Sequence, residues 1–397
     1  MSSSNSSRGN LSVAFDLAPV LSMVFVGFFI AGMTMPVLPL HIHIGLGYGT
    51  FVVGLIAGSQ FGAALLTRLW AGGYADRRGP KRAVVLGLWG AILAGAFYCA
   101  STFFEQWPAV AASLLFVGRA VLGSAESLLI TGSVSWGLAK AGPAHAGKVI
   151  AWVGTAMFSA LAAGAPLGTM LYSSYGFQAI AVATICIPLL ASLMVLRLTE
   201  IAGSGSRSGS MKRVFGAVWL PGLGAALSSI GYGSVLTFAV LLFSSQNWPN
   251  AWAAVSCFAA ALVAARVTIG HLPDKLGGAI TALVFVLLEV FGLLLLWLAP
   301  EPVTALVGIC AVGAGYSLVF PSFGISVVGA APAANRGMAM GLFSACLDLA
   351  LAVSGPVLGL VGNMLGIQGI FLASALLSLG AAPIAAILLC RQRHGNK

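Results

Sequence analysis

The sequence predicts an all-α integral membrane protein with twelve transmembrane helices in two pseudo-symmetric six-helix bundles. Three observations support this fold class: the composition, the spacing of the apolar runs and an internal repeat. Of the 397 residues, 59% are hydrophobic and 7% are charged, with a mean hydropathy of +1.02, whereas a soluble protein is about one quarter charged. This apolar excess exceeds what a soluble core needs, so the chain is expected to fold in lipid.

Twelve apolar runs are each long enough to cross a bilayer, which takes roughly 20 residues. They cover residues 17–40, 50–71, 82–103, 110–138, 147–171, 177–197, 215–243, 250–270, 279–299, 302–328, 336–361 and 367–390. A Gly/Ser-rich segment separates the first six runs from the last six. The predicted parts are a cytoplasmic tail at 1–16, a first six-helix bundle at 17–197, a cytoplasmic linker at 198–214, a second six-helix bundle at 215–390 and a cytoplasmic tail at 391–397.

The loops between these runs divide by charge. One set carries the chain's loop Lys and Arg residues, whereas the alternate loops near 41–49, 104–109, 172–176, 244–249, 298–301 and 362–366 carry none. Basic loops stay in the cytoplasm, so both termini and the linker are predicted to be cytoplasmic. The net charge of +10 therefore indicates membrane topology and no nucleic-acid partner. The polar first ten residues are expected to be disordered.

An internal repeat supports the division into halves. Four residues around the first basic loop, Arg68, Gly72, Asp76 and Gly79, recur 198 positions later as Arg266, Gly270, Asp274 and Gly277. Two further residues recur 190 positions later, in the pairs Pro166 and Pro356, and Gly176 and Gly366. Near-constant offsets indicate duplicated halves of parallel topology, an arrangement found in secondary transporters.

The first basic loop carries the most recognisable motif, because residues 72–81 read GGYADRRGPK and the weaker copy at 270–277 reads GHLPDKLG. The loop resembles the signature between the second and third helices of the major facilitator superfamily, although Tyr74 and Pro80 depart from its commonest residues. The resemblance covers essentially the whole chain. The segments 119–123, 315–321 and 347–349 resemble the bacterial YhhS/YfcJ branch, often called arabinose-efflux-like.

The resemblance implies that this loop and its copy form a cytoplasmic latch between the two halves, released during alternating access. The latch residues are Arg68, Gly72, Asp76, Arg77, Gly79, Lys81, Gly270, Asp274 and Gly277. Gly72 and Gly79 are expected to allow close backbone approach and a tight turn. The alternative is a basic loop that only sets topology, but topology requires no acid such as Asp76.

Three ionisable residues inside the predicted spans are candidates for proton coupling. Arg119 and Glu126 are seven residues apart in one span, which places them on one helix face about 10 Å apart. Asp348 lies in the eleventh span. Charged groups within a membrane are costly and by default functional, and the resemblance implies that Arg119 influences a nearby acid. Either acid could carry the proton, and a purely structural ion pair is the alternative. Glu289, in the ninth span, is interpreted as a structural hydrogen-bonding acid.

Proline and aromatic residues provide further candidates. Pro166 and Pro356 lie in glycine-rich segments and are predicted helix kinks. The family's antiporter motif on the fifth helix has Gly and Pro together, whereas here Ala165 intervenes and the adjacent Gly-Pro pair is in the eleventh span. The pattern favours export, although ordinary kinked packing is the alternative. The residues predicted to line a cavity between the halves are Gln60, Trp136, Trp152, Tyr232, Thr237 and Tyr316, each of which could instead serve packing. His41 and His43, at the outer end of the first span, are expected to be solvated.

The function expected from these features is proton-coupled secondary transport by alternating access in the bacterial inner membrane. Export of a small organic solute, such as a sugar, an organic acid or a drug-like compound, is favoured over import by the same fold. A membrane enzyme or receptor would need a polar catalytic cluster or an added soluble domain, which the sequence does not show. No cofactor or metal is expected, since there is no phosphate-binding loop or ligand cluster. The expected partners are the substrate, protons and membrane lipid, with the chain acting as a monomer.

Overall fold

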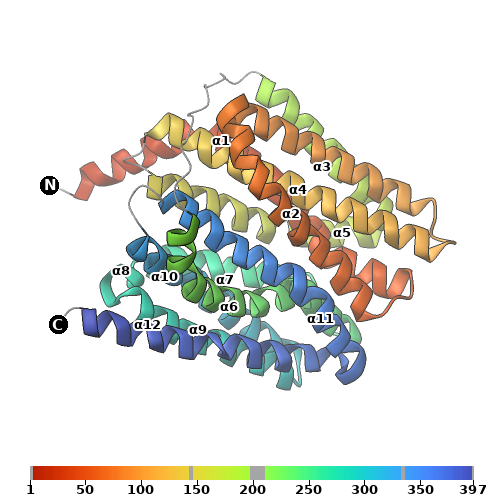
Figure 1. Ribbon diagram of the computed structural model, residues 1–397. Coiled ribbons are helices and arrows are strands. Elements are labelled where there is room, and N and C mark those ends of the chain that lie inside the picture. Colours follow the sequence, from red (N-terminus) through yellow and green to blue (C-terminus); the bar gives the residue numbers. More distant parts are fainter. Residues whose placement is uncertain (1–2, 143–145, 197–210, 332–335, 396–397) are drawn as a thin grey trace. The chain divides into compact units, whose positions relative to one another are not determined.

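The computed structural model describes residues 3–142, 146–196, 211–331 and 336–395 (Figure 1). The described secondary structure is helical throughout. Its elements are α1 (Ser3–Leu40), the π-helix η1 (His41–Gly45), α2 (Thr50–Arg78), α3 (Pro80–Thr102), α4 (Pro108–Ala141), α5 (Ala146–Leu196), α6 (Met211–Ser245), α7 (Ala253–Ile269), α8 (Leu272–Leu276), α9 (Gly278–Leu298), α10 (Pro302–Ala330), α11 (Arg336–Leu379) and α12 (Ala381–Gly395).

Nine helical stretches in the described ranges are long and apolar enough to cross a membrane. Two of these stretches contain a break in the helical backbone, at Gly176 in α5 (φ 70°, ψ −171°) and at Gly366 in α11 (φ 76°, ψ 170°). The apolar α7, Ala253–Ile269, is shorter. Counting each broken stretch as two spans and adding α7 gives the twelve predicted spans, so the all-α membrane fold class is confirmed.

The described chain forms two compact units. The first draws on Met1–Met33 and Ala63–Ser206, and the second on Thr34–Gly62 and Arg207–Lys397. Helices α1 and α2 therefore each contribute to both units. Residues 34–62, which end α1 and begin α2, pack with helices that lie far later in the chain.

In the first unit, α3 packs against both α4 and α5 (Figure 1). Small residues set these close contacts, since a Cβ atom on Gly87 of α3 would lie 2.8 Å from the Ala125 carbonyl oxygen of α4. Helices in lipid associate mainly through such close packing. The core of this unit includes buried side chains from α1, α3, α4 and α5, namely Val20, Met23, Val84, Leu88, Leu129, Trp136, Ala191 and Val195.

In the second unit, α6 packs on α11 and α10, while α9 packs on α10, α11 and α12 (Figure 1). The first half of α2 also joins this unit through glycines. A Cβ atom on Gly58 would lie 2.6 Å from the Ala352 carbonyl oxygen of α11, and one on Gly359 would lie 2.7 Å from the Phe51 Cα atom. The Thr50 hydroxyl lies 2.7 Å from the Gly359 carbonyl oxygen and 2.8 Å from Asn363 Oδ1.

Two local expectations are wrong. Residues 3–10, expected to be disordered, belong to α1, because extending an existing helix does not require a new nucleus. His41, expected to be solvated, is buried, because helix α1 continues past Leu40 into η1. The predicted linker at 198–214 lies outside the described residues up to position 210, and α6 begins at Met211.

Candidate functional site

The first charged site lies on α4 in the first unit. Arg119 and Glu126 are both buried, with 4% and 6% of their surfaces exposed. The ring of Tyr98 from α3 lies beside Gly118, where a Cβ atom would be 2.8 Å from Tyr98 Cε1. Tyr98 is itself fully buried. Neighbouring helices thus hold a cation, an acid and a phenol inside an apolar unit.

The third predicted coupling residue, Asp348, lies on α11 in the second unit and is 3% exposed. Its stretch of α11 faces α6, since a Cβ atom on Gly222 would lie 3.0 Å from Cys346 Sγ. Asp348 is therefore an acid on a membrane-spanning helix with its side chain packed inside the second unit. The cost of such burial makes a functional or pairing role the expected one.

A further polar cluster in the second unit includes Glu289, which the sequence analysis interpreted as a structural hydrogen-bonding acid. Ser228 of α6 donates a hydrogen bond of 2.5 Å to Glu289 Oε2 of α9. The adjacent Ser229 hydroxyl lies 3.2 Å from the Tyr316 hydroxyl of α10, and Arg266 of α7 donates a hydrogen bond of 3.1 Å to the Ser317 carbonyl oxygen of α10. The sequence showed Glu289 as an acid in a span, but not that it belongs to a cluster drawn from α6, α7, α9 and α10.

The predicted cavity residues have different surroundings. Tyr232 and Tyr316 stack with ring centroids 4.6 Å apart and planes at 17°, so the structure brings these two together. Gln60 and Thr237 are buried polar residues of the second unit. Trp136 is fully buried in the hydrophobic core of the first unit, which favours its packing interpretation. Trp152 is 37% exposed.

The two copies of the basic loop share the same backbone conformation at one glycine. Gly79 precedes α3 with φ 93° and ψ 146°, and Gly277 precedes α9 with φ 90° and ψ 145°. The predicted turn at Gly79 is therefore present and recurs at its repeat partner. Gly72 differs from expectation, because a Cβ atom there would meet no atom within 4 Å. Its position on the surface of α2 leaves it without a close backbone neighbour.

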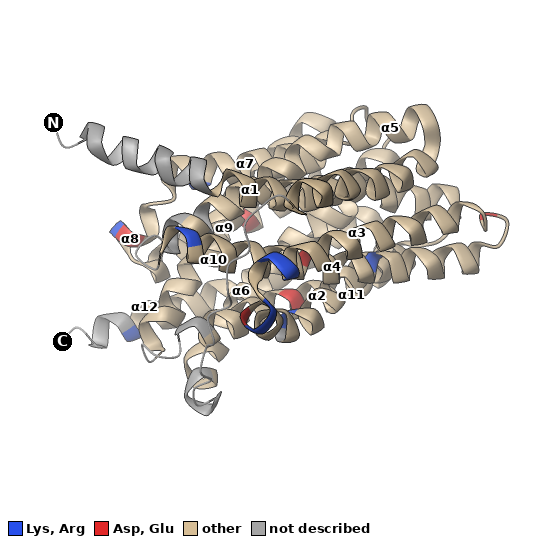
Figure 2. Cartoon of the chain, turned by 90° about the horizontal axis from the view of Figure 1, so that it is seen from above, with Lys and Arg blue, Asp and Glu red and all other residues tan. Residues whose placement is uncertain are grey.

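The charged residues of the two loops lie at helix ends (Figure 2). Lys81, in the first turn of α3, donates a hydrogen bond of 3.2 Å to the Leu196 carbonyl oxygen at the end of α5. Arg77 is exposed, while Arg68 and Asp76 are half-buried. In the second copy, Gly270 and Asp274 are exposed. The Lys81 bond ties the first loop to α5 within its own unit.

The two prolines predicted to kink helices lie in α5 and α11. Pro166 and Pro356 both lie inside helices, ten residues before the breaks at Gly176 and Gly366. In the first unit, a Cβ atom on Gly164 would lie 2.9 Å from the Met33 backbone nitrogen of α1. The glycines flanking Pro166 thus let α5 approach α1 closely.

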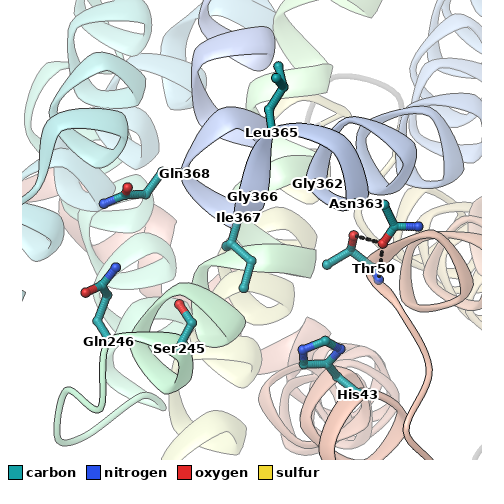
Figure 3. A pocket seen from close by; sticks show the side chains of 10 residues that line it. All are labelled: His43, Thr50, Ser245, Gln246, Gly362, Asn363, Leu365, Gly366, Ile367 and Gln368. Carbon is teal, nitrogen blue, oxygen red and sulfur yellow. Dashed lines mark hydrogen bonds between the residues drawn. The ribbon is translucent and has the colours of Figure 1, made fainter.

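A polar pocket of about 380 Å³ in the second unit was not predicted (Figure 3). Its walls come from the η1–α2 region, the end of α6 and the break in α11, with the lining residues His43, Thr50, Ser245, Gln246, Gly362, Asn363, Leu365, Gly366, Ile367 and Gln368. Hydroxyl, amide and imidazole groups here can hydrogen-bond a small polar solute. These residues lie in segments predicted to be loops or helix ends, so their sequence spacing did not place them together. Among the described residues, no group of three metal-ligating side chains occurs.

Comparison with known proteins agrees with this geometry. The family model described as Major Facilitator Superfamily matches residues 20–300 and 223–397. An uncharacterized MFS-type transporter of Pseudomonas aeruginosa is 38% identical over 98% of this chain and 96% of its own length. The uncharacterized MFS-type transporter YhhS of Escherichia coli is 36% identical over 96% of this chain and 93% of its own length.

Two kinds of solved structure share the fold. A point mutant of the nucleoside transporter NupG has a TM-score of 0.73 at 16% identity, covering 94% of this chain and 99% of its own. A bacterial homologue of the human lysosomal transporter Spinster, inward-facing and occupied, has a TM-score of 0.74 at 14% identity, covering 94% and 96%. With the family model and these relatives covering nearly its full length, the chain belongs to the Major Facilitator Superfamily and is a multi-pass membrane transporter, not an enzyme.

Proposed function

We propose that the chain is a proton-coupled exporter of a small organic solute, such as a sugar, an organic acid or a drug-like compound, in the bacterial inner membrane. The observation that carries this proposal is the burial of Arg119 and Glu126 on α4 within an apolar unit. Burying two ionisable groups in a spanning helix costs free energy. Reversible protonation of the acid is one function that would explain why the chain has them there.

In the proposed mechanism, Glu126 or Asp348 takes up a proton from outside and releases it inside, in exchange for substrate. Arg119 stabilises the ionised form of Glu126 across two helical turns. Tyr98 offers a hydroxyl in the same surroundings. The cation Arg119 favours neutral or anionic solutes over organic cations. The residues proposed to contact the solute are Gln60, Trp152, Tyr232, Thr237 and Tyr316, whereas Trp136 is left to core packing. The stacked Tyr232 and Tyr316 have the strongest geometric support.

The test is a substrate screen on purified protein in proteoliposomes with an imposed pH gradient, read by substrate-induced proton flux. The single variants Glu126→Gln and Asp348→Asn are compared with Glu105→Gln, which removes an exposed acid. We expect at least one buried-acid variant to lose proton-driven transport while Glu105→Gln retains it. Full coupling in both would refute the carrier assignment. Uptake into inside-out vesicles would support export, and uptake only into right-side-out cells would indicate the alternative, an importer.

The basic loops are proposed to act as the cytoplasmic latch, with both termini on that side. The matched geometry of Gly79 and Gly277 supports an equivalent role for the two copies. Asp76→Asn is expected to reduce turnover several-fold while membrane insertion stays intact. Glu301→Gln, at an exposed acid outside the two basic loops, is the control. Normal turnover by Asp76→Asn would remove the latch role from Asp76.

A further inference from the structure

A groove runs along the surface of the first unit between α2, α3 and α4. Its deep part has a volume of about 560 Å³ and is lined mainly by the apolar side chains Trp70, Leu86, Trp89, Leu93, Phe116 and Val117. A second cavity of about 350 Å³ lies at the start of α3 and includes Lys81 and Arg82. Leu86 and Trp89 line both, so the two spaces adjoin along α3. We call the combined space the α2–α4 groove.

The α3 wall of the groove is a single helical stripe. Arg82, Leu86, Trp89 and Leu93 follow one another at intervals of four, three and four residues, which places them on one helix face. The three apolar members are 38%, 54% and 51% exposed. From Arg82 to Leu93 the stripe runs about 16 Å along the helix, close to half of a ~30 Å hydrocarbon core.

The open end of the groove is positively charged. Lys81 and Arg82 lie in the first turn of α3, where the helix dipole also favours an anion. The hydrogen bond from Lys81 to the Leu196 carbonyl oxygen fixes this ammonium group at the mouth. The surrounding loop carries four bases at 77–82 against the single acid Asp76. Basic pockets between membrane helices near the surface recognise anionic lipid headgroups.

The deep end of the groove suits a hydrocarbon chain. Thr67 of α2 donates its hydroxyl hydrogen to Ser124 Oγ of α4 over 2.9 Å. These two polar residues of the lining therefore hydrogen-bond to each other. The rings of Trp70 and Tyr74 lie with centroids 4.7 Å apart and planes tilted by 34°, so the α2 side of the groove is aromatic. An acyl chain along this floor would replace the looser packing of bulk lipid with dispersion contacts.

We propose that the α2–α4 groove is a binding site for an anionic phospholipid. The phosphate contacts Lys81 and Arg82, and one acyl chain follows Leu86, Trp89 and Leu93. The two positive charges select an anionic headgroup, and the apolar groove orders the acyl chain. The inference does not depend on the direction or coupling of transport.

The test measures quenching of tryptophan fluorescence by dibrominated lipids in bilayers of unbrominated phosphatidylcholine. The signal of Trp89 is obtained by subtracting that of Trp89→Phe. We expect dibrominated phosphatidylglycerol to quench Trp89 at a mole fraction on the order of tenfold below that needed for dibrominated phosphatidylcholine. Two bases near a membrane surface each contribute about fivefold, and phosphatidylcholine keeps part of the phosphate contact.

Two pairs of matched variants locate the site. Lys81→Gln/Arg82→Gln is expected to abolish the preference for phosphatidylglycerol, whereas Arg78→Gln/Lys140→Gln removes two bases outside the groove and should keep it. Ala120→Phe fills the groove and should reduce Trp89 quenching by both lipids, whereas Ala260→Phe, at an exposed position on α7, should not. Helical circular dichroism and size exclusion check that each variant is folded, and Arg82→Gln alone replaces the double variant if that one is not.

Equal quenching by both brominated lipids would overturn the proposal, as would an unchanged preference in Lys81→Gln/Arg82→Gln. Equal loss of preference in Arg78→Gln/Lys140→Gln would overturn it as well, because general surface charge would then explain the effect. Protection of Trp89 from both lipids, together with cross-linking of Trp89→Cys between two copies, would instead identify a second copy as the occupant. None of these outcomes depends on a transport assay.

Discussion

Ser228 of α6 donates its hydroxyl hydrogen to Glu289 of α9 across 2.5 Å, inside the second unit. The carboxyl group fits there because position 231 is glycine, and a Cβ atom at that position would overlap Glu289 Oε1. Glu289 is fully buried, and Glu289 Oε1 has no hydrogen-bond partner among the described residues. This geometry agrees with a structural role for Glu289, distinct from the proposed carriers Glu126 and Asp348.

Replacing Glu289 with Gln is expected to change thermal stability little, since an amide oxygen can accept the same hydrogen bond. Glu289→Ala removes the acceptor and leaves a cavity beside α6, so we expect a loss of about 2–4 kcal/mol. A double-mutant cycle with Ser228→Ala measures the coupling, expected to be roughly 0.5–2 kcal/mol. The measurement is thermal unfolding in detergent. A large loss in Glu289→Gln, or strictly additive effects in the cycle, would contradict this role.

The contact between α2 and α11 makes Gly355 intolerant of a side chain. A Cβ atom at Gly355 would overlap the Gly54 carbonyl oxygen, so Gly355→Ala is expected to lower stability by about 1–3 kcal/mol. Gly341, on the same helix α11, has no atom within 4 Å of a Cβ position. Gly341→Ala should therefore raise stability by up to about 1 kcal/mol. Melting temperatures of the two variants test these predictions, and a melting temperature of Gly355→Ala equal to or above that of the unchanged protein would show that the contact between α2 and α11 is not tightly packed.

The turns at Gly79 and Gly277 require glycine for backbone reasons. Both residues have φ near +90° with ψ near +145°, a region that other residues occupy only at a cost of about 1–3 kcal/mol. Gly79→Ala and Gly277→Ala should each destabilise the protein by a similar amount. Gly72→Ala, in the same loop region but inside α2 and facing open space, serves as the stability control. Unequal effects of the two turn variants, measured by thermal unfolding, would argue against equivalent turns.

Thr50 anchors the start of α2 to α11. Its hydroxyl lies within hydrogen-bonding distance of Gly359 O and Asn363 Oδ1, and its N–H donates to Asn363 Oδ1 over 3.0 Å. Thr50→Val keeps the shape but removes the hydroxyl bonds, so hydrogen exchange of residues 46–54 should accelerate about threefold to thirtyfold, matching a loss of roughly 0.6–2 kcal/mol. Thr102→Val, which loses only a bond to Cys99 O in its own helix, should leave these amides unchanged. Unaltered exchange in Thr50→Val would show that the anchor contributes nothing.

The sequence was sufficient for those features that depend on composition and local backbone chemistry. Apolar length located the spans, and the repeat identified Gly79 with Gly277 and Gly176 with Gly366, which the structure shows with matching positive φ values. These turns could be predicted from the sequence because only glycine adopts such φ values at a helix boundary at low cost.

The sequence was less informative about which helix faces which. In a soluble helix, a polar face distinguishes outside from inside, but lipid is as apolar as the core, so the exposed Trp152 and the fully buried Trp136 looked equivalent. The same limit hid the pocket beside Thr50 and Asn363, whose members are far apart in the chain. Burial of Glu289 could be expected from its span, but its bond to Ser228 could not.

The contact between Thr50 and Asn363 also has a consequence for biosynthesis. The two residues are 313 positions apart, and ribosomes add about 5–20 residues per second, so Asn363 emerges roughly 15 to 60 seconds after Thr50. During that interval the glycine face of α2 that includes Gly54 and Gly58 lies in the bilayer without its native neighbour. The nascent chain must therefore protect this face, with lipid, the translocation machinery or a temporary helix partner, until α11 is inserted.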